Sequence, residues 1–166
     1  MPQLSIVHAI NQGLHRAMDA DSKVLLMGED IGKLGGVFRV TEGLQQSFGD
    51  ERVIDSPLAE SGIVGTAIGL ALYGFRPVVE IQFDGFVFPA FDQIVVQLAR
   101  MRFRSAGALS LPITIRIPYG GGIGSVEHHV NQNMLRLLIQ ELQQSTPLEI
   151  HCDVQRSQFH LHKAFL

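Results

Sequence analysis

The chain passes from an expected strand into an apolar run through Ile54-Asp55-Ser56-Pro57-Leu58-Ala59-Glu60-Ser61-Gly62. Pro57 fixes one backbone angle, and Ser61 and Gly62 then allow a helix to begin, so this stretch predicts a strand-to-helix junction. Glu60 lies at that junction, beside a long run of apolar and small residues where a buried carboxylate is costly. Because open α/β sheets hold ligands at such junctions, Glu60 is the first candidate for chemistry. The alternative is that the acid only complements the positive end of a helix dipole.

On both sides of this junction, short apolar strands alternate with helical patterns. Apolar residues at helical spacing follow Ser5, which can cap a helix over 5–20. The run at 24–27 is entirely apolar and predicts a strand buried on both faces. The alternation predicts an α/β fold, a mostly parallel sheet with helices on both faces. The other expected helices cover 41–48, 61–73 and 89–103, and the other expected strands cover 52–54, 77–81 and 112–117.

The helix expected at 61–73 is rich in glycine and alanine, although glycine lowers helix propensity. Gly62, Gly65 and Gly69 leave almost no side-chain bulk on part of its surface. Close packing against another helix would compensate for that cost.

Other chemical motifs are weaker. The glycine run at 120–124 lacks the Lys-Ser/Thr and the spacing of a nucleotide loop. Adjacent histidines at 128 and 129 would point to opposite sides of an extended segment, so they would not share a metal. The tail carries His151 and Cys152 without a familiar zinc spacing. A group of aromatic residues, Phe83, Phe86, Phe88 and Phe91, is typical of core packing.

Composition limits the classes of protein that the chain can be. With 166 residues, 46% apolar and 17% charged, it predicts one domain with a large core. A formal charge of −3 without a basic stripe argues against nucleic acid as a partner. The single cysteine fits a reducing compartment. No export signal or apolar run long enough to span a membrane is visible, so we expect a soluble, cytoplasmic protein without membrane contact.

An ordered set of motifs resembles one enzyme family over residues 3–129. It is similar to the β subunit of the decarboxylating component of 2-oxo acid dehydrogenase complexes, in its pyrimidine-binding half. The motifs are Gly28-Glu29-Asp30, Gly35-Gly36-Val37-Phe38-Arg39, Pro57-Leu58-Ala59-Glu60-Ser61-Gly62, Arg76-Pro77, Glu80-Ile81-Gln82-Phe83, Ile117-Pro118 and Glu127-His128-His129.

This resemblance implies a transketolase-like pyrimidine-binding domain, with thiamine diphosphate held between an α and a β subunit. The family glutamate that matches Glu60 hydrogen-bonds N1′ of the aminopyrimidine ring and favours its imino form. Phe86 matches the aromatic residue that stacks on that ring, and Leu58 and Gln82 match its neighbours. Glu29 matches an acid close to the site.

The resemblance also implies the reaction and its partners. The family decarboxylates a small 2-oxo acid oxidatively, pyruvate or a branched-chain acid, and passes the acyl group to a lipoyl-lysine of an acyltransferase. His129 matches the histidine near the substrate and lipoyl entrance. The backbone around Ile113 matches part of a potassium site in some members.

Two departures from the family pattern shape the expectations. The chain has no Gly-Asp-Gly motif for a Mg²⁺-bound diphosphate, which in the family belongs to the α subunit, so we expect no metal ligands and no activity in this chain alone. The likeness ends at 129, so residues 1–129 are expected to be an incomplete pyrimidine-binding domain and residues 130–166 a divergent tail from a frame-shifted or truncated reading frame. We expect the tail to supply no paired strand and to be poorly ordered from about 146. A catalytically inactive chain that only binds the α subunit is the alternative.

Overall fold

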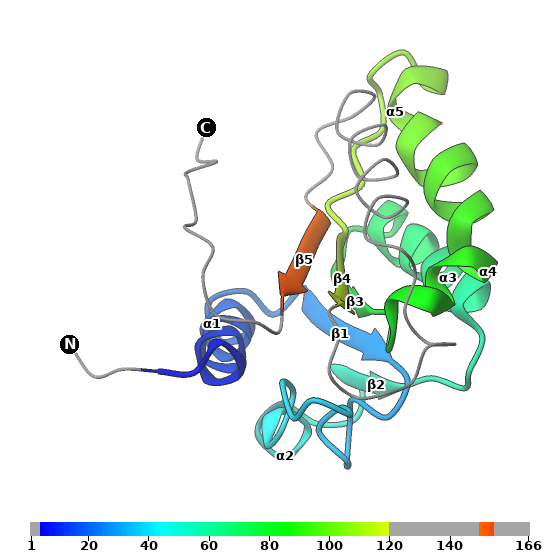
Figure 1. The fold of residues 1–166 in the computed structure, drawn as a ribbon. Helices are drawn as coiled ribbons and strands as arrows, with labels where there is room; N and C mark the ends of the chain where they lie inside the picture. Colours follow the sequence, from blue (N-terminus) through cyan, green and yellow to red (C-terminus); the bar gives the residue numbers. More distant parts are fainter. Residues whose placement is uncertain (1–3, 120–149, 155–166) are drawn as a thin grey trace.

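The computed structural model describes residues 4–119 and the backbone of 150–154. Helices and strands alternate along the chain, as the sequence predicts (Figure 1). The elements are α1 (Ile6–Ala20), β1 (Val24–Gly28), α2 (Leu44–Phe48), β2 (Val53–Asp55), α3 (Glu60–Leu72), β3 (Arg76–Glu80), the 3₁₀ turn η1 (Asp84–Phe86), α4 (Val87–Asp92), the π-helix η2 (Gln93–Leu98), α5 (Ala99–Arg104), β4 (Thr114–Tyr119) and β5 (Ile150–Val154).

The strands form one parallel sheet in the order β2-β1-β3-β4-β5. Leu26 of β1 lies opposite Val53 of β2 and Val78 of β3, which places β1 between them. All five residues of β1 are buried, so the prediction of a strand buried on both faces is confirmed. Gly28 is required at the end of β1, because a Cβ there would lie 2.8 Å from the backbone oxygen of Glu80.

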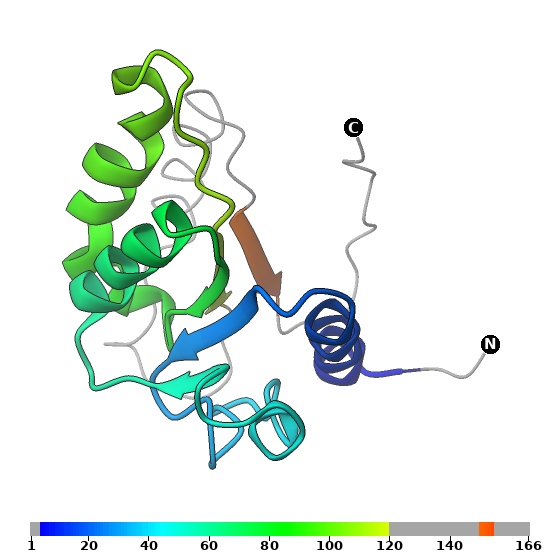
Figure 2. The same ribbon diagram turned by 180° about the vertical axis from the view of Figure 1, so that it is seen from behind.

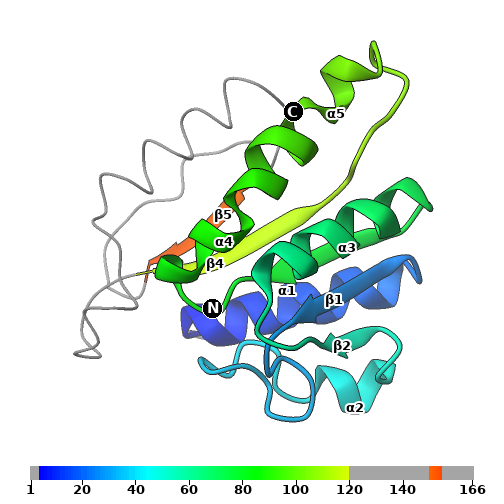
Figure 3. The same cartoon turned by 90° about the vertical axis from the view of Figure 1, so that its right-hand side faces the viewer.

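Two apolar cores lie on the two faces of the sheet. In Figures 1 and 2, α3, α4 and α5 lie on one side of the strands and α1 lies on the other; Figure 3 looks onto the first side. The larger core joins α3 and the α4–α5 helix to the sheet through residues such as Val64, Ile94 and Ile115. The smaller core joins α1 and α2 to β1 and β2 around Met18 and Leu44. The expected covering of both faces is therefore confirmed.

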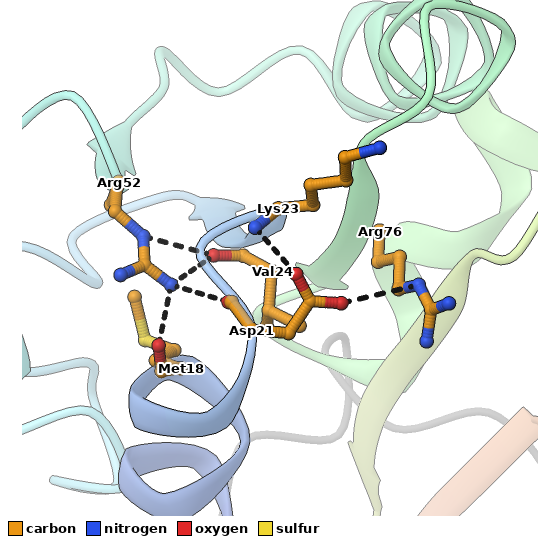
Figure 4. A network of polar contacts seen from close by, with 6 residues as sticks. All are labelled: Met18, Asp21, Lys23, Val24, Arg52 and Arg76. Carbon is orange, nitrogen blue, oxygen red and sulfur yellow. Dashed lines mark hydrogen bonds and ion pairs between the residues drawn. The ribbon is translucent and has the colours of Figure 1, made fainter.

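A polar network ties α1 to the beginnings of the strands (Figure 4). The guanidinium of Arg52, just before β2, donates to the backbone oxygens of Met18 (2.9 Å), Asp21 (3.0 Å) and Val24 (2.7 Å). The carboxylate of Asp21 pairs with Arg76 at 3.3 Å and accepts from a backbone N–H at 2.8 Å. These contacts stabilise the end of the sheet at which β1, β2 and β3 begin.

The helices differ from the sequence predictions mainly at their ends. The first is confirmed, because Ser5 accepts from the backbone N–H of His8 at 3.3 Å and caps α1. The helix expected to begin at Thr41 begins at Leu44, because the Thr41 hydroxyl instead donates to the Ile31 oxygen at 2.6 Å. The helix expected at 89–103 begins at Val87 and contains the π segment. Across the described part of the chain, no helix combines the length and apolar character needed to span a membrane.

The tail contributes a strand that the sequence analysis did not predict. Residues 150–154 form β5, which pairs in parallel with β4 from Ile115 opposite Ile150 to Tyr119 opposite Val154. The expectation that the tail supplies no paired strand is therefore wrong for this segment, while the expectation of poor order from about residue 146 stays a prediction. Backbone pairing to an edge does not require the alternating side-chain pattern that was missing from the tail.

Candidate functional site

The strand order places a crevice at one edge of the sheet. The chain moves from β1 to β2 on one side and then crosses to β3 on the other side of β1. In open parallel sheets, ligands bind outside the carboxyl ends of the strands at such a switch of direction. The segments that leave β1, β2 and β3 at this edge carry Glu29, Leu58 with Glu60, and Gln82 with Phe86, respectively. The fold thus brings five of the predicted site residues to the same edge of the sheet.

Glu60 is the first residue of α3 and only 6% exposed. The helix begins one residue earlier than expected, since the N–H of Ile63 donates to the Ala59 oxygen at 2.9 Å. Ala59 provides no side-chain cap, so the carboxylate lies at an uncapped positive helix end. An open cleft of about 190 Å³ lies beside this junction, and its wall includes Pro57, Ala59 and Gly62.

Glu29 lies close enough to Glu60 for the two carboxyl groups to interact. Burial raises the pKa of Glu29, and the negative charges of Asp30 and Glu60 raise it further. Its Oε2 atom is buried without a hydrogen-bond partner among the described residues. A carboxyl group in such surroundings holds a proton to higher pH and can donate a hydrogen bond as well as accept one.

The other predicted residues are placed differently. Gln82 is buried and Phe86 is half-buried against the larger core. Leu58 is 60% exposed, so its side chain is available for contacts outside the described part of the chain. Ile113 is buried just before β4 begins, at the opposite end of the strands from Glu60. His129 lies outside the described residues.

The expected group of four phenylalanines does not form as predicted. The rings of Phe83 and Phe86 are in contact, with centroids 5.4 Å apart, whereas Phe88 and Phe91 are exposed. Among the described residues, Phe38 also contacts this pair, with its ring centroid 5.9 Å from that of Phe83. Sequence spacing could not reveal this contact, because the two residues lie on segments that follow different strands.

The sequence analysis also missed a buried ion pair near this edge. The Nε of Arg116 on β4 donates to a carboxylate oxygen of Glu80 on β3 at 3.2 Å, and its Nη2 contacts the same oxygen. The two residues lie opposite each other in the sheet, and both are almost fully buried. The signal was a single charge in each of the expected strands 77–81 and 112–117, one acidic and one basic, since buried charges require partners. In the part of the chain that the structure describes, no cluster of acidic, histidine or cysteine side chains could hold a metal.

Comparison with known proteins identifies the family of this domain. The sequence pattern of the transketolase pyrimidine-binding domain matches residues 2–147, and the chain belongs to that family. This match extends beyond the boundary expected at residue 129, while the two pairwise alignments below each cover 126 residues, so that boundary stays a prediction.

Two relatives within this family show which class of enzyme subunit the chain is similar to. It is 68% identical over 126 residues to the pyruvate dehydrogenase E1 component subunit beta of Leifsonia xyli, covering 76% of this chain and 37% of that protein. It is 60% identical over 126 residues to the 3-methyl-2-oxobutanoate dehydrogenase subunit beta of Mycobacterium tuberculosis, covering 76% of this chain and 36% of that protein. The predicted resemblance to β subunits of the pyruvate and branched-chain type is therefore confirmed, and the chain spans less than half the length of these relatives.

A solved structure supports the fold. A subunit described as a split gene transketolase, inactive beta4 tetramer, superposes with a TM-score of 0.62 at 15% identity, covering 94% of this chain and 53% of that one. At this identity the likeness concerns the fold, and it agrees with the predicted transketolase-like α/β domain.

Proposed function

We propose that this chain is the pyrimidine-binding part of a β subunit in a thiamine-diphosphate-dependent 2-oxo acid dehydrogenase. Its substrate class is pyruvate or a branched-chain 2-oxo acid. The observation that carries the proposal is the buried carboxylate of Glu60, which lies at an uncapped helix start and interacts with the Glu29 carboxyl group. The relatives at 60–68% identity support the choice of enzyme class.

The residues at the carboxyl edge fit the pyrimidine half of this cofactor. An aminopyrimidine is a flat ring with nitrogen atoms at its rim, so it needs an apolar face and a few hydrogen-bonding groups. Phe86 supplies a half-buried aromatic face, and Glu29 supplies a buried oxygen that lacks a partner within the described residues. The Glu60 carboxylate would hydrogen-bond the ring at N1′, and surroundings that exclude water would strengthen that bond.

Each remaining residue has an orienting role in this proposal. Gln82 would bind at the ring edge, and the exposed Leu58 would pack against the cofactor or the α subunit. When bound, thiamine diphosphate supplies the nucleophile for the 2-oxo carbon and the electron sink for the loss of carbon dioxide. His129 would act near the entrance used by substrate and by the lipoyl-lysine of an acyltransferase. The α subunit would supply the diphosphate and Mg²⁺ site, since the sequence has no Gly-Asp-Gly motif.

The test is to co-express the chain with the α subunit of a pyruvate dehydrogenase and to measure decarboxylation with thiamine diphosphate, Mg²⁺ and an artificial electron acceptor. We expect turnover only when both chains and the cofactor are present. Glu60→Gln keeps the size of the side chain but removes its charge, so turnover should fall by about 100-fold or more. Glu51→Gln, an exposed acid at the opposite end of the strands, is the matched control and should keep full turnover.

Three results would change the proposal. Turnover by the chain without a partner would contradict a shared site. Near-normal turnover of Glu60→Gln with saturating cofactor would remove the role assigned to Glu60. Co-purification with the α subunit but no turnover would favour the alternative of a chain that binds its partner without catalysis.

A further inference from the structure

Three aromatic rings from the segments that follow β1 and β3 form a continuous chain of contacts. The Phe38 and Phe83 rings meet edge to face, with centroids 5.9 Å apart and planes at 75°. The Phe83 and Phe86 rings meet in the same way, at 5.4 Å and 79°. Phe38 comes from the segment that follows β1, and the other two rings come from the segment that follows β3. The contacts therefore join the two segments that separate at the switch of direction between β1 and β3.

The three rings differ in their contact with the two apolar cores. Phe86 packs against the larger core, whereas Phe38 and Phe83 belong to neither core and are half-buried. Phe86 is thus in contact with a core, and the two other rings lie outside both cores. Their edge-to-face geometry constrains the plane of the next ring, because aromatic pairs prefer this arrangement over face-to-face stacking.

Hydrogen bonds from α1 hold the segment that carries Phe38. The side-chain amide of Asn11 on α1 donates to the backbone oxygens of Val40 (2.7 Å) and Glu42 (3.1 Å). Gly35 has a φ of +81°, and a Cβ there would lie 2.7 Å from the Cα of Glu42. The backbone around Phe38 is therefore fixed by α1 and by its own turn, so the ring has a defined position from which to support Phe83.

We propose that Phe38 and Phe83 are positioning residues that set the plane of the Phe86 ring against the pyrimidine ring of the cofactor. This inference rests on the proposed function, in which Phe86 stacks on that ring. Each edge-to-face contact biases the orientation of the neighbouring ring by a factor of about 2 to 10 in an equilibrium constant, so loss of one contact should release the Phe86 ring from its binding orientation and weaken cofactor binding by up to that factor.

The test measures the dissociation constant of Mg²⁺–thiamine diphosphate by calorimetry on the chain assembled with an α subunit. Phe38→Leu should raise this constant by about 2- to 10-fold, and Phe83→Leu should do the same if the first variant folds poorly. Phe38→Tyr keeps the ring and should restore wild-type affinity. Phe103→Leu changes a ring that is 87% exposed on α5 and should have no effect.

A double variant separates positioning from general damage. Because Phe38 acts through Phe86, adding Phe38→Leu to Phe86→Leu should cause no further loss of affinity. Wild-type affinity in Phe38→Leu and Phe83→Leu, or losses that multiply in the double variant, would overturn the positioning role while leaving the proposed function intact. Failure of the wild-type assembly to bind the cofactor would overturn the proposed function, and this inference with it.

Discussion

The carboxyl group of Glu29 lies where its charged form is disfavoured for two reasons. Burial removes water from it, and the negative charges of Asp30 and Glu60 repel a further negative charge, so its pKa is raised above the value of 4.5 for a free side chain. The folded chain therefore binds this proton up to a higher pH than the unfolded chain does. Between those two pKa values, the free energy of unfolding must fall as the pH rises.

Glu29→Gln should remove this dependence, because the amide has no charge to lose. We expect the variant to unfold at higher urea concentration than the wild type at neutral pH. The difference should shrink as the pH falls towards the pKa of the unfolded state, near 4.5. Urea unfolding curves for both chains from about pH 4 to about pH 8 measure this directly.

The control for this series is the exposed acid Glu51. Glu51→Gln should unfold at the same urea concentration as the wild type at every pH, because the Glu51 side chain is exposed in the folded chain. A Glu29→Gln variant whose stability differs from wild type by the same amount at all pH values would show that the Glu29 carboxyl group is not perturbed by the fold.

At the scale of single residues, the sequence predicted the acidic site residue Glu60 but not the contacts between side chains from different strands. Glu60 could be predicted because a carboxylate beside an apolar run at a strand end is a local feature. The Phe38–Phe83 contact and the Glu80–Arg116 pair join residues on separate strands or on segments that follow separate strands, so no spacing rule reaches them. Only the sheet register brings such side chains together.

Arg52 links three elements, because its side chain binds the end of α1 while its backbone leads into β2. Its guanidinium satisfies oxygens at the carboxyl end of α1, where a positive charge also complements the helix dipole. It also lies 5.2 Å from the centre of the Phe48 ring on α2. The planar fork of arginine suits several acceptors at once, which a lysine ammonium cannot reproduce.

Arg52→Ala should lower the free energy of unfolding by about 2–4 kcal/mol, because charge-assisted hydrogen bonds are lost and backbone oxygens lose their donors. Arg52→Lys should lie between the alanine variant and the wild type. Arg104→Ala removes an exposed bond to Gln97 and should stay within about 0.5 kcal/mol of wild type. Urea unfolding of the four chains provides the measurement, and equal stability of the alanine and wild-type chains would show that the network does not stabilise the fold.

At the scale of elements, the sequence predicted where helices and strands occur better than where they end. The prediction for 41–48 was wrong at its start because the Thr41 hydroxyl binds the Ile31 oxygen and Gly43 adopts a left-handed φ of +78° before α2. The close helix packing expected for the glycines of α3 is met only in part. A Cβ at Gly65 would lie 3.8 Å from Gln93, whereas one at Gly69 would contact none of the described residues.

For the whole molecule, the alternation of apolar strands and helices was enough to predict a parallel sheet covered on both faces. That prediction succeeded because all five residues of β1 and three of the five residues of β3 are buried, so the composition of these strands reflects their environment. The prediction missed the last strand of the sheet, β5, which is held through backbone hydrogen bonds to β4. An edge strand needs few apolar side chains, so the tail gave no readable signal.

The contribution of β5 can be measured by comparing two shortened chains. A chain ending at residue 149 would leave β4 with an open edge, since β5 pairs with it from Ile115 to Tyr119. Unpaired edges promote association between copies, and the lost hydrogen bonds would lower the free energy of unfolding by about 2–5 kcal/mol. A chain ending at residue 154 keeps β5 and should retain the free energy of unfolding and the oligomeric state of the full chain. Light scattering and urea unfolding compare them, and equal behaviour of the two shortened chains would show that β5 does not stabilise the sheet.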